Sequence, residues 1–234
     1  MSIPGSVAEL DDWAKARARW LMLTLYQEPA RPNQLTPDDE DWLIWLALAG
    51  RGFGKTRLGA EDVSNFARLH PGARIAGLFD TFDAGRDVGV EGESGLLAVV
   101  PESCVRSWNR SLGQLVFVND ARFDIYSAEK PSSLRGPQHH RAWVDELAKF
   151  RYLQEAWDKL MFGLRLGDRP QCVVTTTPKP LGLLRDLLAR PATRVTRGST
   201  FNNAAHLSAA ALEELRRRYE GTSLGLQELH GGIL

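Results

Sequence analysis

Short apolar runs alternate along the chain with longer segments whose apolar residues recur every three or four positions. The runs at 42–48, 73–79, 141–144 and 171–175 are nearly continuous, which is typical of strands buried on both faces of a sheet. Their alternation with helical periodicity predicts an α/β domain, a mostly parallel sheet flanked by helices on both faces. The pattern predicts strands at 42–48, 73–79, 114–118, 122–126, 141–144, 171–175 and 193–197. It predicts helices at 6–27, 57–69, 84–89, 150–162, 181–189 and 208–219.

Glycine, proline and polar residues mark the connections between these elements. The segment 28–37 contains three prolines and cannot be helical throughout. Asn119 and Asp120 predict a hairpin turn between the strands at 114–118 and 122–126. We expect an N-terminal helix and adenine-side segment at 1–37, a core at 38–200, and a C-terminal helical or linker segment at 201–234.

A glycine-rich turn follows the first strand and ends in Gly54-Lys55-Thr56 before a predicted helix. The spacing from Ala49 matches the phosphate-binding pattern G-x-x-x-x-G-K-[ST], with alanine in place of the first glycine. Such a loop turns backbone N–H groups toward phosphates, its lysine reaches the terminal phosphates, and its hydroxyl can ligate Mg²⁺. The residues expected to contact the nucleotide here are Gly50, Arg51, Gly52, Phe53, Gly54, Lys55, Thr56 and Arg57.

Two adjacent acids, Asp145 and Glu146, follow the apolar strand at 141–144. Open α/β sheets bind their ligands at the carboxyl ends of the strands, so these acids should lie beside the phosphate loop. Asp145 would join Thr56 in holding Mg²⁺, and Glu146 would polarise the attacking water. An acid pair of this kind often only opens a solvated helix, and the phosphate loop is what favours the functional interpretation.

The strand at 171–175 ends in Thr175-Thr176-Thr177-Pro178, which places hydroxyl groups at the same edge of the sheet. They could hydrogen-bond the γ-phosphate or the attacking water. The alternative is that threonine is simply a favourable residue where a strand meets a turn.

Together these motifs resemble the large terminase subunit of tailed bacteriophages and gene-transfer agents, whose ATPase domain drives double-stranded DNA into a procapsid. The resemblance rests on Gln34 in a proline-rich segment, Trp42 and Trp45, residues 50–57, residues 143–146 and residues 175–178. It implies a P-loop NTPase of the additional-strand, catalytic-glutamate type, acting on ATP with Mg²⁺.

The resemblance also implies roles for single residues. Gln34 would recognise adenine, Arg51 would sense the phosphate, and Thr175 to Thr177 would form the coupling motif, with Thr176 and Thr177 at the nucleotide. Arg135 lies where such motors carry an arginine finger for the neighbouring subunit, with Arg141 and Arg122 as rivals. Lys55, Arg51, Arg135 and Glu146 are therefore the expected catalytic set.

The family further implies partners: the phosphate backbone of double-stranded DNA without sequence preference, the portal protein and the small terminase subunit. It implies a homo-oligomeric ring on the procapsid in the host cytoplasm, with a monomeric isolated domain. The chain ends at Leu234, about ninety residues after Asp145, and we expect no nuclease activity in it. The alternatives are a superfamily-2 helicase-like fragment and a nucleotide-binding scaffold that does not hydrolyse.

Composition changes this picture little. Lys plus Arg and Asp plus Glu number 29 each, so no net field attracts DNA, although a local basic surface remains compatible with this balance. We expect Cys104 and Cys172 to be buried thiols, and His139 with His140 to form a solvated turn rather than a metal site. Arg216 to Arg218 could contact DNA phosphates, but a solvated helix face is the simpler interpretation. No apolar stretch suggests a membrane span.

Overall fold

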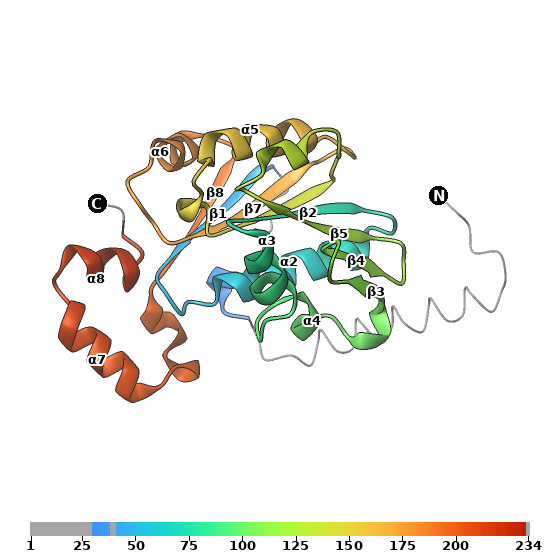
Figure 1. Ribbon diagram of the computed structural model, residues 1–234. Coiled ribbons are helices and arrows are strands. Elements are labelled where there is room, and N and C mark those ends of the chain that lie inside the picture. The colour runs from blue at the N-terminus through green and yellow to red at the C-terminus, as the bar shows by residue number, and fades with distance from the viewer. Residues whose placement is uncertain (1–29, 38–40, 233–234) are drawn as a thin grey trace.

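The computed structural model describes residues 30–37 and 41–232, so the helix expected at 6–27 lies outside the described residues. An eight-stranded sheet forms the centre, in the order β3-β4-β5-β2-β6-β7-β1-β8 (Figure 1). All neighbouring strands from β5 to β8 in this order pair in parallel, and β3 and β4 add an antiparallel edge. The strands are β1 (Ile44–Ala49), β2 (Arg74–Phe79), β3 (Val105–Asn109), β4 (Gln114–Phe117), β5 (Arg122–Ser127), β6 (Arg141–Asp145), β7 (Gln171–Thr176) and β8 (Thr193–Gly198).

The strand order confirms the predicted fold class. The strand that precedes the phosphate loop, β1, is separated from the strand that carries the two acids, β6, by the inserted strand β7. The paired registers bring the carboxyl ends of all three strands to one edge, because Leu48 lies beside Thr176 and Asp145 lies beside Thr175.

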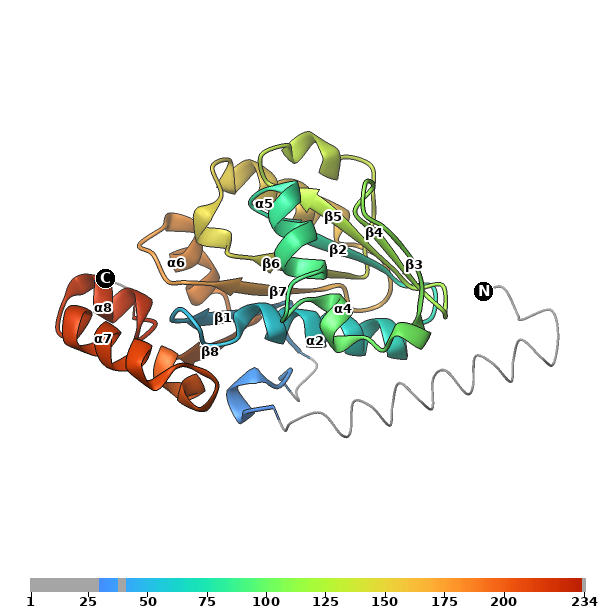
Figure 2. The same ribbon diagram turned by 60° about the horizontal axis from the view of Figure 1, so that its bottom comes forward.

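Helices cover both faces of the sheet, with α5 and α6 on one side and α2, α3 and α4 on the other (Figures 1 and 2). On the α5 side, Leu46, Val144 and Val174 pack against Trp157 and Leu184. Because side chains alternate along a strand, the neighbouring residue Trp143 points to the other face. The helices are α2 (Lys55–Leu69), α3 (Phe82–Ala84), α4 (Leu96–Val99), α5 (Leu153–Gly163), α6 (Gly182–Ala189), α7 (Ala209–Tyr219) and α8 (Ser223–Glu228).

Most predicted elements are confirmed within a few residues, and the differences have local causes. The helix expected at 84–89 is the short α3 followed by a π-helical segment, Gly85–Val90. The pattern missed β3, an edge strand whose residues are exposed or half-buried and so lack an apolar run. It also missed the short helices α4 and α8.

The C-terminal segment packs against the phosphate loop rather than away from it. After β8 the chain forms a 3₁₀ segment, Thr200–His206, and then α7 and α8. Leu229 is buried, and its carbonyl accepts a hydrogen bond from the N–H of Thr200. A Cβ on Gly50 would lie 2.6 Å from the carbonyl oxygens of Glu228 and Leu229, so glycine is needed for this close approach.

Candidate active site

The loop between β1 and α2 has the backbone shape that phosphate binding requires. Gly52 and Gly54 adopt φ angles of 74° and 96°, in the left-handed region that glycine tolerates. Phe53 is fully buried against the backbone of Gly198 and anchors the middle of the loop. Because α2 begins at Lys55, its unpaired N–H groups and positive dipole end lie directly after the loop, an arrangement that binds anions.

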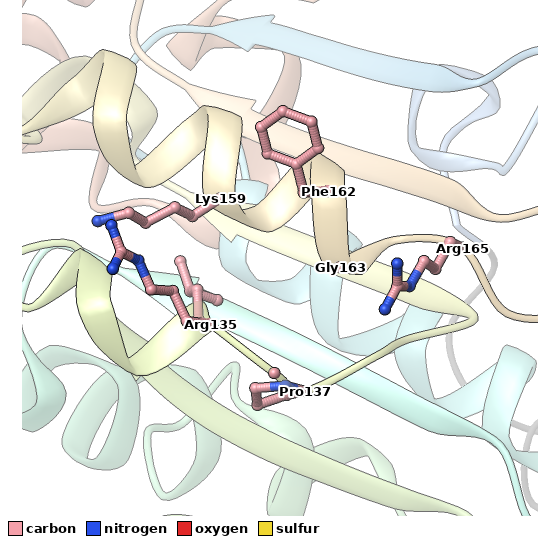
Figure 3. A pocket seen from close by; sticks show the side chains of 8 residues that line it. Arg135, Pro137, Lys159, Phe162, Gly163 and Arg165 are labelled. Atoms are coloured by element: carbon pink, nitrogen blue, oxygen red, sulfur yellow. The ribbon is translucent and has the colours of Figure 1, made fainter.

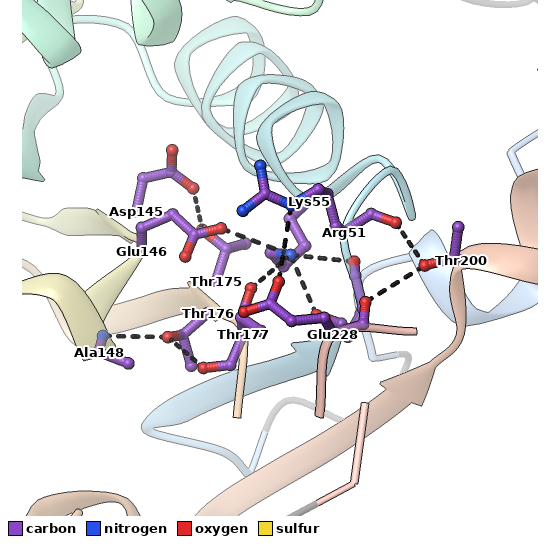
Figure 4. A network of polar contacts seen from close by, with 12 residues as sticks. Arg51, Lys55, Asp145, Glu146, Ala148, Thr175, Thr176, Thr177, Thr200 and Glu228 are labelled. Carbon is purple, nitrogen blue, oxygen red and sulfur yellow. Dashed lines mark hydrogen bonds and ion pairs between the residues drawn. The ribbon is translucent and has the colours of Figure 1, made fainter. Parts of the chain in front are cut away.

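The Lys55 ammonium group lies where the loop, the acid pair and the threonine motif meet (Figure 4). It donates hydrogen bonds to the carbonyl oxygens of Ala49 at 3.0 Å and Gly50 at 3.1 Å, and to Thr177 Oγ1 at 3.2 Å. It also forms an ion pair with Glu146 Oε1 at 3.4 Å. Its side chain is 7% exposed, so this charge acts in a poorly solvated environment.

The two acids at the end of β6 occupy different environments. Asp145 is buried, and burial raises the pKa of its carboxyl group to about 6, although the hydrogen bond from Thr175 opposes that rise. Glu146 is partly exposed and has a left-handed backbone, with φ 54° and ψ 45°. Non-glycine residues in that region cost on the order of 1–3 kcal/mol and cluster at functional sites. The strained backbone directs the Glu146 carboxylate toward Lys55.

Each threonine of the predicted coupling motif contacts a different part of the site. Thr175 donates a hydrogen bond to Asp145 Oδ1 at 2.6 Å. Thr176 accepts one from the N–H of Ala148, in the turn after Glu146. Thr177 accepts one from Lys55. The motif therefore links the acid pair, the following turn and the loop lysine.

The oxygen donors at this edge suit Mg²⁺. Thr56 lies in the first turn of α2, and Asp145 accepts a hydrogen bond from Thr175 on one carboxylate oxygen while the other accepts none from the described residues. No group of three or more His, Cys, Asp or Glu side chains in the described ranges could enclose a metal ion. Mg²⁺ usually binds through one or two protein oxygens together with water and substrate phosphates, so these residues fit it.

Gln34 contacts the phosphate loop, together with an arginine that the sequence did not single out. Gln34 lies in the 3₁₀ segment η1 (Pro32–Gln34), and its Nε2 lies 3.5 Å from the carbonyl oxygen of Gly54. Arg31 donates to Gln34 Oε1 at 3.0 Å and to the carbonyl oxygen of Phe53, and its guanidinium lies over the Phe53 ring. Figure 2 shows this segment, in blue, beside α2. The position of Arg31 three residues before Gln34 was the available signal.

The C-terminal segment fixes the outer side of the loop. Thr200 Oγ1 donates to the carbonyl oxygen of Arg51 at 2.6 Å, and Asn203 Nδ2 donates to that of Gly52 at 2.8 Å. The Arg51 side chain is 78% exposed, with its Nε 3.6 Å from a Glu228 carboxylate oxygen. Arg51 is thus at the rim of the site, where its long side chain is free to turn toward a bound phosphate.

Arg135 lies outside this group of contacts. It lines a cavity of about 390 Å³ beneath α5, together with Lys159, Phe162 and Arg165 (Figure 3). Lys159 pairs with Glu155, whereas the guanidinium groups of Arg135 and Arg165 form no hydrogen bond or ion pair with side chains in the described part of the chain.

The two rival arginines already have partners. Arg141 is buried in an ion pair with Asp62, and Arg122 pairs with Asp124. Of the three candidates for a finger, Arg135 is the one that can reach outward.

Other sequence expectations have mixed outcomes. The expectation of a solvated turn at His139 is wrong: its ring is buried against Tyr126, and both ring nitrogens lack hydrogen-bond partners. Arg217 and Arg218 pair with Glu214, and Arg216 stacks on Phe201, as on an ordinary helix face. Both cysteines are buried and free. None of the described helices is long and apolar enough to cross a membrane.

Solved structures share this fold. The large terminase ATPase domain of Thermus phage P74-26 superposes with a TM-score of 0.69 at 16% identity, over 92% of this chain and 98% of that one. The large terminase of another thermophilic bacteriophage gives 0.65 at 16%, over 93% and 53%. That of bacteriophage HK97 gives 0.62 at 14%, over 93% and 55%. The chain therefore spans about half the length of these last two proteins. The second of the three terminases was also solved with ADP and with ATP-gamma-S.

Sequence comparison identifies the family. No curated protein matches the chain. The family described as terminase large subunit, T4likevirus-type, N-terminal, matches residues 46–233, which include the phosphate loop, the acid pair and the threonine motif. The chain therefore belongs to the terminase large subunits, the ATPases of viral DNA packaging, and carries their N-terminal ATPase domain.

Proposed function

We propose that this chain hydrolyses Mg²⁺-ATP and that the hydrolysis drives double-stranded DNA into a procapsid. The observation that carries the proposal is the meeting of Lys55, Glu146 and Thr177 at one carboxyl edge of the sheet, directly before the N-terminus of α2. A scaffold that only holds nucleotide would not need a strained, partly exposed glutamate there.

The proposed mechanism is mainly electrostatic. The N–H groups of the loop and of the first turn of α2 bind the phosphates, and Lys55 leaves its contacts with Ala49 and Gly50 for the β- and γ-phosphates. Glu146, released from Lys55, accepts a hydrogen bond from water and orients it in line with the γ-phosphoryl group. Thr177 moves with Lys55 and so reports the state of the phosphate to residues after β7.

Thr56 and Asp145 would hold Mg²⁺, which when bound neutralises charge on the phosphate oxygens. The hydroxyl and the carboxylate reach this position from two elements, α2 and β6. Gln34, held by Arg31 beside the loop, would contact adenine, and Arg51 would contact the phosphates from the rim.

Hydrolysis itself is tested by phosphate release. We expect the purified chain to release phosphate from ATP slowly, with full loss of activity in EDTA and recovery on adding Mg²⁺. Phosphate release that is unchanged by EDTA would exclude the proposed metal site.

Arg135 is the proposed finger for a neighbouring copy. Its guanidinium is exposed, unpaired among the described side chains and surrounded by the cations Lys159 and Arg165, so the cavity favours an approaching anion such as a triphosphate. An isolated monomer would therefore be a slow ATPase, and the rate per chain should rise with protein concentration.

Mixing two inactive variants tests this arrangement. Arg135→Ala retains an intact nucleotide site, and Glu146→Gln retains an intact finger. If the finger acts between copies, the mixture should hydrolyse ATP faster than either variant alone at the same total concentration. A mixture no faster than the mean of the two would show that Arg135 does not act in trans.

The proposed partners are double-stranded DNA, the portal protein, the small terminase subunit and further copies of the chain in a ring on the procapsid, within the host cytoplasm. A motor that moves along any sequence should contact phosphates rather than bases. DNA-stimulated ATPase activity should therefore be independent of sequence and fall steeply with salt. Stimulation that depends on one sequence would contradict this proposal.

A further inference from the structure

The first threonine of the motif, Thr175, points into the protein and not toward the phosphate loop. Its side chain is fully buried and lies between Trp143 and Asp145. The indole Nε1 of Trp143 donates a hydrogen bond to Thr175 Oγ1 at 3.1 Å, and that hydroxyl donates to Asp145 Oδ1 at 2.6 Å. A short chain of hydrogen bonds therefore ends on the carboxylate that would hold Mg²⁺.

The indole N–H decides where the threonine hydroxyl points. Thr175 Oγ1 has one hydrogen to donate, and two acceptors lie within reach: Asp145 Oδ1 at 2.6 Å and the carbonyl oxygen of Val144 at 3.2 Å. The Trp143 N–H occupies a lone pair of the oxygen, and the shorter bond to the charged carboxylate is the stronger one. Without the indole donor, the hydroxyl is freer to turn to Val144, which would leave Asp145 without its donor.

The same indole also contacts the helix that begins with Lys55 and Thr56. A Cβ on Gly59 would lie 2.1 Å from atoms of the Trp143 ring, so the ring lies directly against the α2 backbone. Phe79 holds the ring from another side, with centroids 5.1 Å apart. The position of Trp143 is therefore fixed relative to the helix that carries Thr56.

We propose that Trp143 and Thr175 are positioning residues that orient the Asp145 carboxylate toward the metal position set by α2, and thereby determine the Mg²⁺ affinity of the site. The inference rests on the proposed function, in which Thr56 and Asp145 bind Mg²⁺. Thr175 holds one carboxylate oxygen, which directs the other toward the cation. Outer partners of metal ligands contribute about 10–100-fold to metal affinity in other proteins.

The chain contains a matched control for this pair. Trp45 on β1 donates its indole N–H to Thr196 Oγ1 on β8 at 2.8 Å. The bond has the same chemistry and also joins neighbouring strands, but within the described part of the chain no carboxylate accepts from that threonine. Loss of this bond should affect stability without affecting Mg²⁺.

The experiment measures Mg²⁺ dependence of nucleotide binding by calorimetry, with a non-hydrolysable ATP analogue. For Thr175→Val we expect the Mg²⁺ concentration at half-saturation to rise by about 10-fold or more, with unchanged nucleotide affinity in EDTA. Thr175→Ser retains the hydroxyl and should resemble the wild type. Trp143→Phe retains the ring without its N–H, and should shift Mg²⁺ dependence in the same direction by a smaller factor.

Thr196→Val and Trp45→Phe should leave Mg²⁺ dependence unchanged. Equal Mg²⁺ dependence in Thr175→Val, Thr196→Val and wild type would overturn the proposal. If Thr175→Val does not fold, Trp143→Phe measured against Trp45→Phe gives the same decision. An Asp145→Asn variant separates the two hypotheses: if it too binds Mg²⁺ and nucleotide normally, the proposed metal site is wrong, whereas a shift in Asp145→Asn alone would reject only the positioning role.

Discussion

The buried ion pair between Asp62 and Arg141 offers a quantitative test of how the site is held together. Asp62 lies on α2 and Arg141 begins β6, so the pair joins the helix of the phosphate loop to the strand of the acid pair. Arg141 Nε lies 2.9 Å from Asp62 Oδ2, and Nη2 lies 2.5 Å from Oδ1. Both side chains are almost fully buried, at 4% and 3% exposed, and the guanidinium lies over the Trp42 ring.

We predict that Arg141→Met greatly destabilises the domain, because it leaves the Asp62 carboxylate buried without its cation. Breaking one side of a buried pair costs about 3–5 kcal/mol, which corresponds to a fall in Tm of roughly 6–20 °C for a domain of this size. Methionine retains much of the apolar volume, so the loss reports mainly on charge. The double variant Asp62→Leu with Arg141→Met should recover much of the stability, since no charge is then left unpaired.

Urea unfolding followed by circular dichroism measures these differences. The exposed pair between Arg217 and Glu214 is the control, and Arg217→Met should cost less than about 1 kcal/mol. If Arg141→Met costs no more than this control, the buried pair does not hold α2 to β6 and the reasoning is refuted.

Three further predictions concern other parts of the chain. Burial lowers the pKa of His139 to about 4 from 6.5, so the unfolded chain binds the extra proton as pH falls through this window; wild-type stability should fall by about 3 kcal/mol from pH 6.5 to 4, and His139→Phe should reduce that loss in urea titrations at several pH values. An equal pH slope in both proteins would contradict the assignment. Thr200→Val should cost about 1–3 kcal/mol by removing the donor to the Arg51 carbonyl, while Thr200→Ser should not; equal stability of both would be evidence against this clamp. Gln34→Ala should weaken ATP binding more than GTP binding in calorimetry, and an equal loss for both nucleotides would remove Gln34 from adenine recognition.

The sequence predicted the fold well because the buried parallel strands carry continuous apolar runs. It failed where local pattern and tertiary role diverge. The edge strand β3 is exposed or half-buried, so no run of apolar residues marks it. His139 is polar yet buried, because its neighbours Tyr126 and Gly163 close over it.

The site was predicted in its parts but not in its connections. The loop, Asp145, Glu146 and the threonines have recognisable motifs, and the structure brings them to one edge. The contacts of Arg31 with Phe53 and of Thr200 with Arg51 depend on chain segments folding back on the loop, which no local pattern encodes. The inward direction of Thr175 follows from the register of β6 and β7, which pairs Asp145 with Thr175.

The most direct test of the account is the Glu146→Gln variant, measured for ATP binding and for hydrolysis on the same preparation. The amide retains the size of the side chain but cannot accept a proton from water or form the ion pair with Lys55. We predict that Mg²⁺-ATP binding persists while hydrolysis falls by about 10²-fold or more, as expected when a general base is lost. Hydrolysis at the wild-type rate in this variant would contradict the central claim.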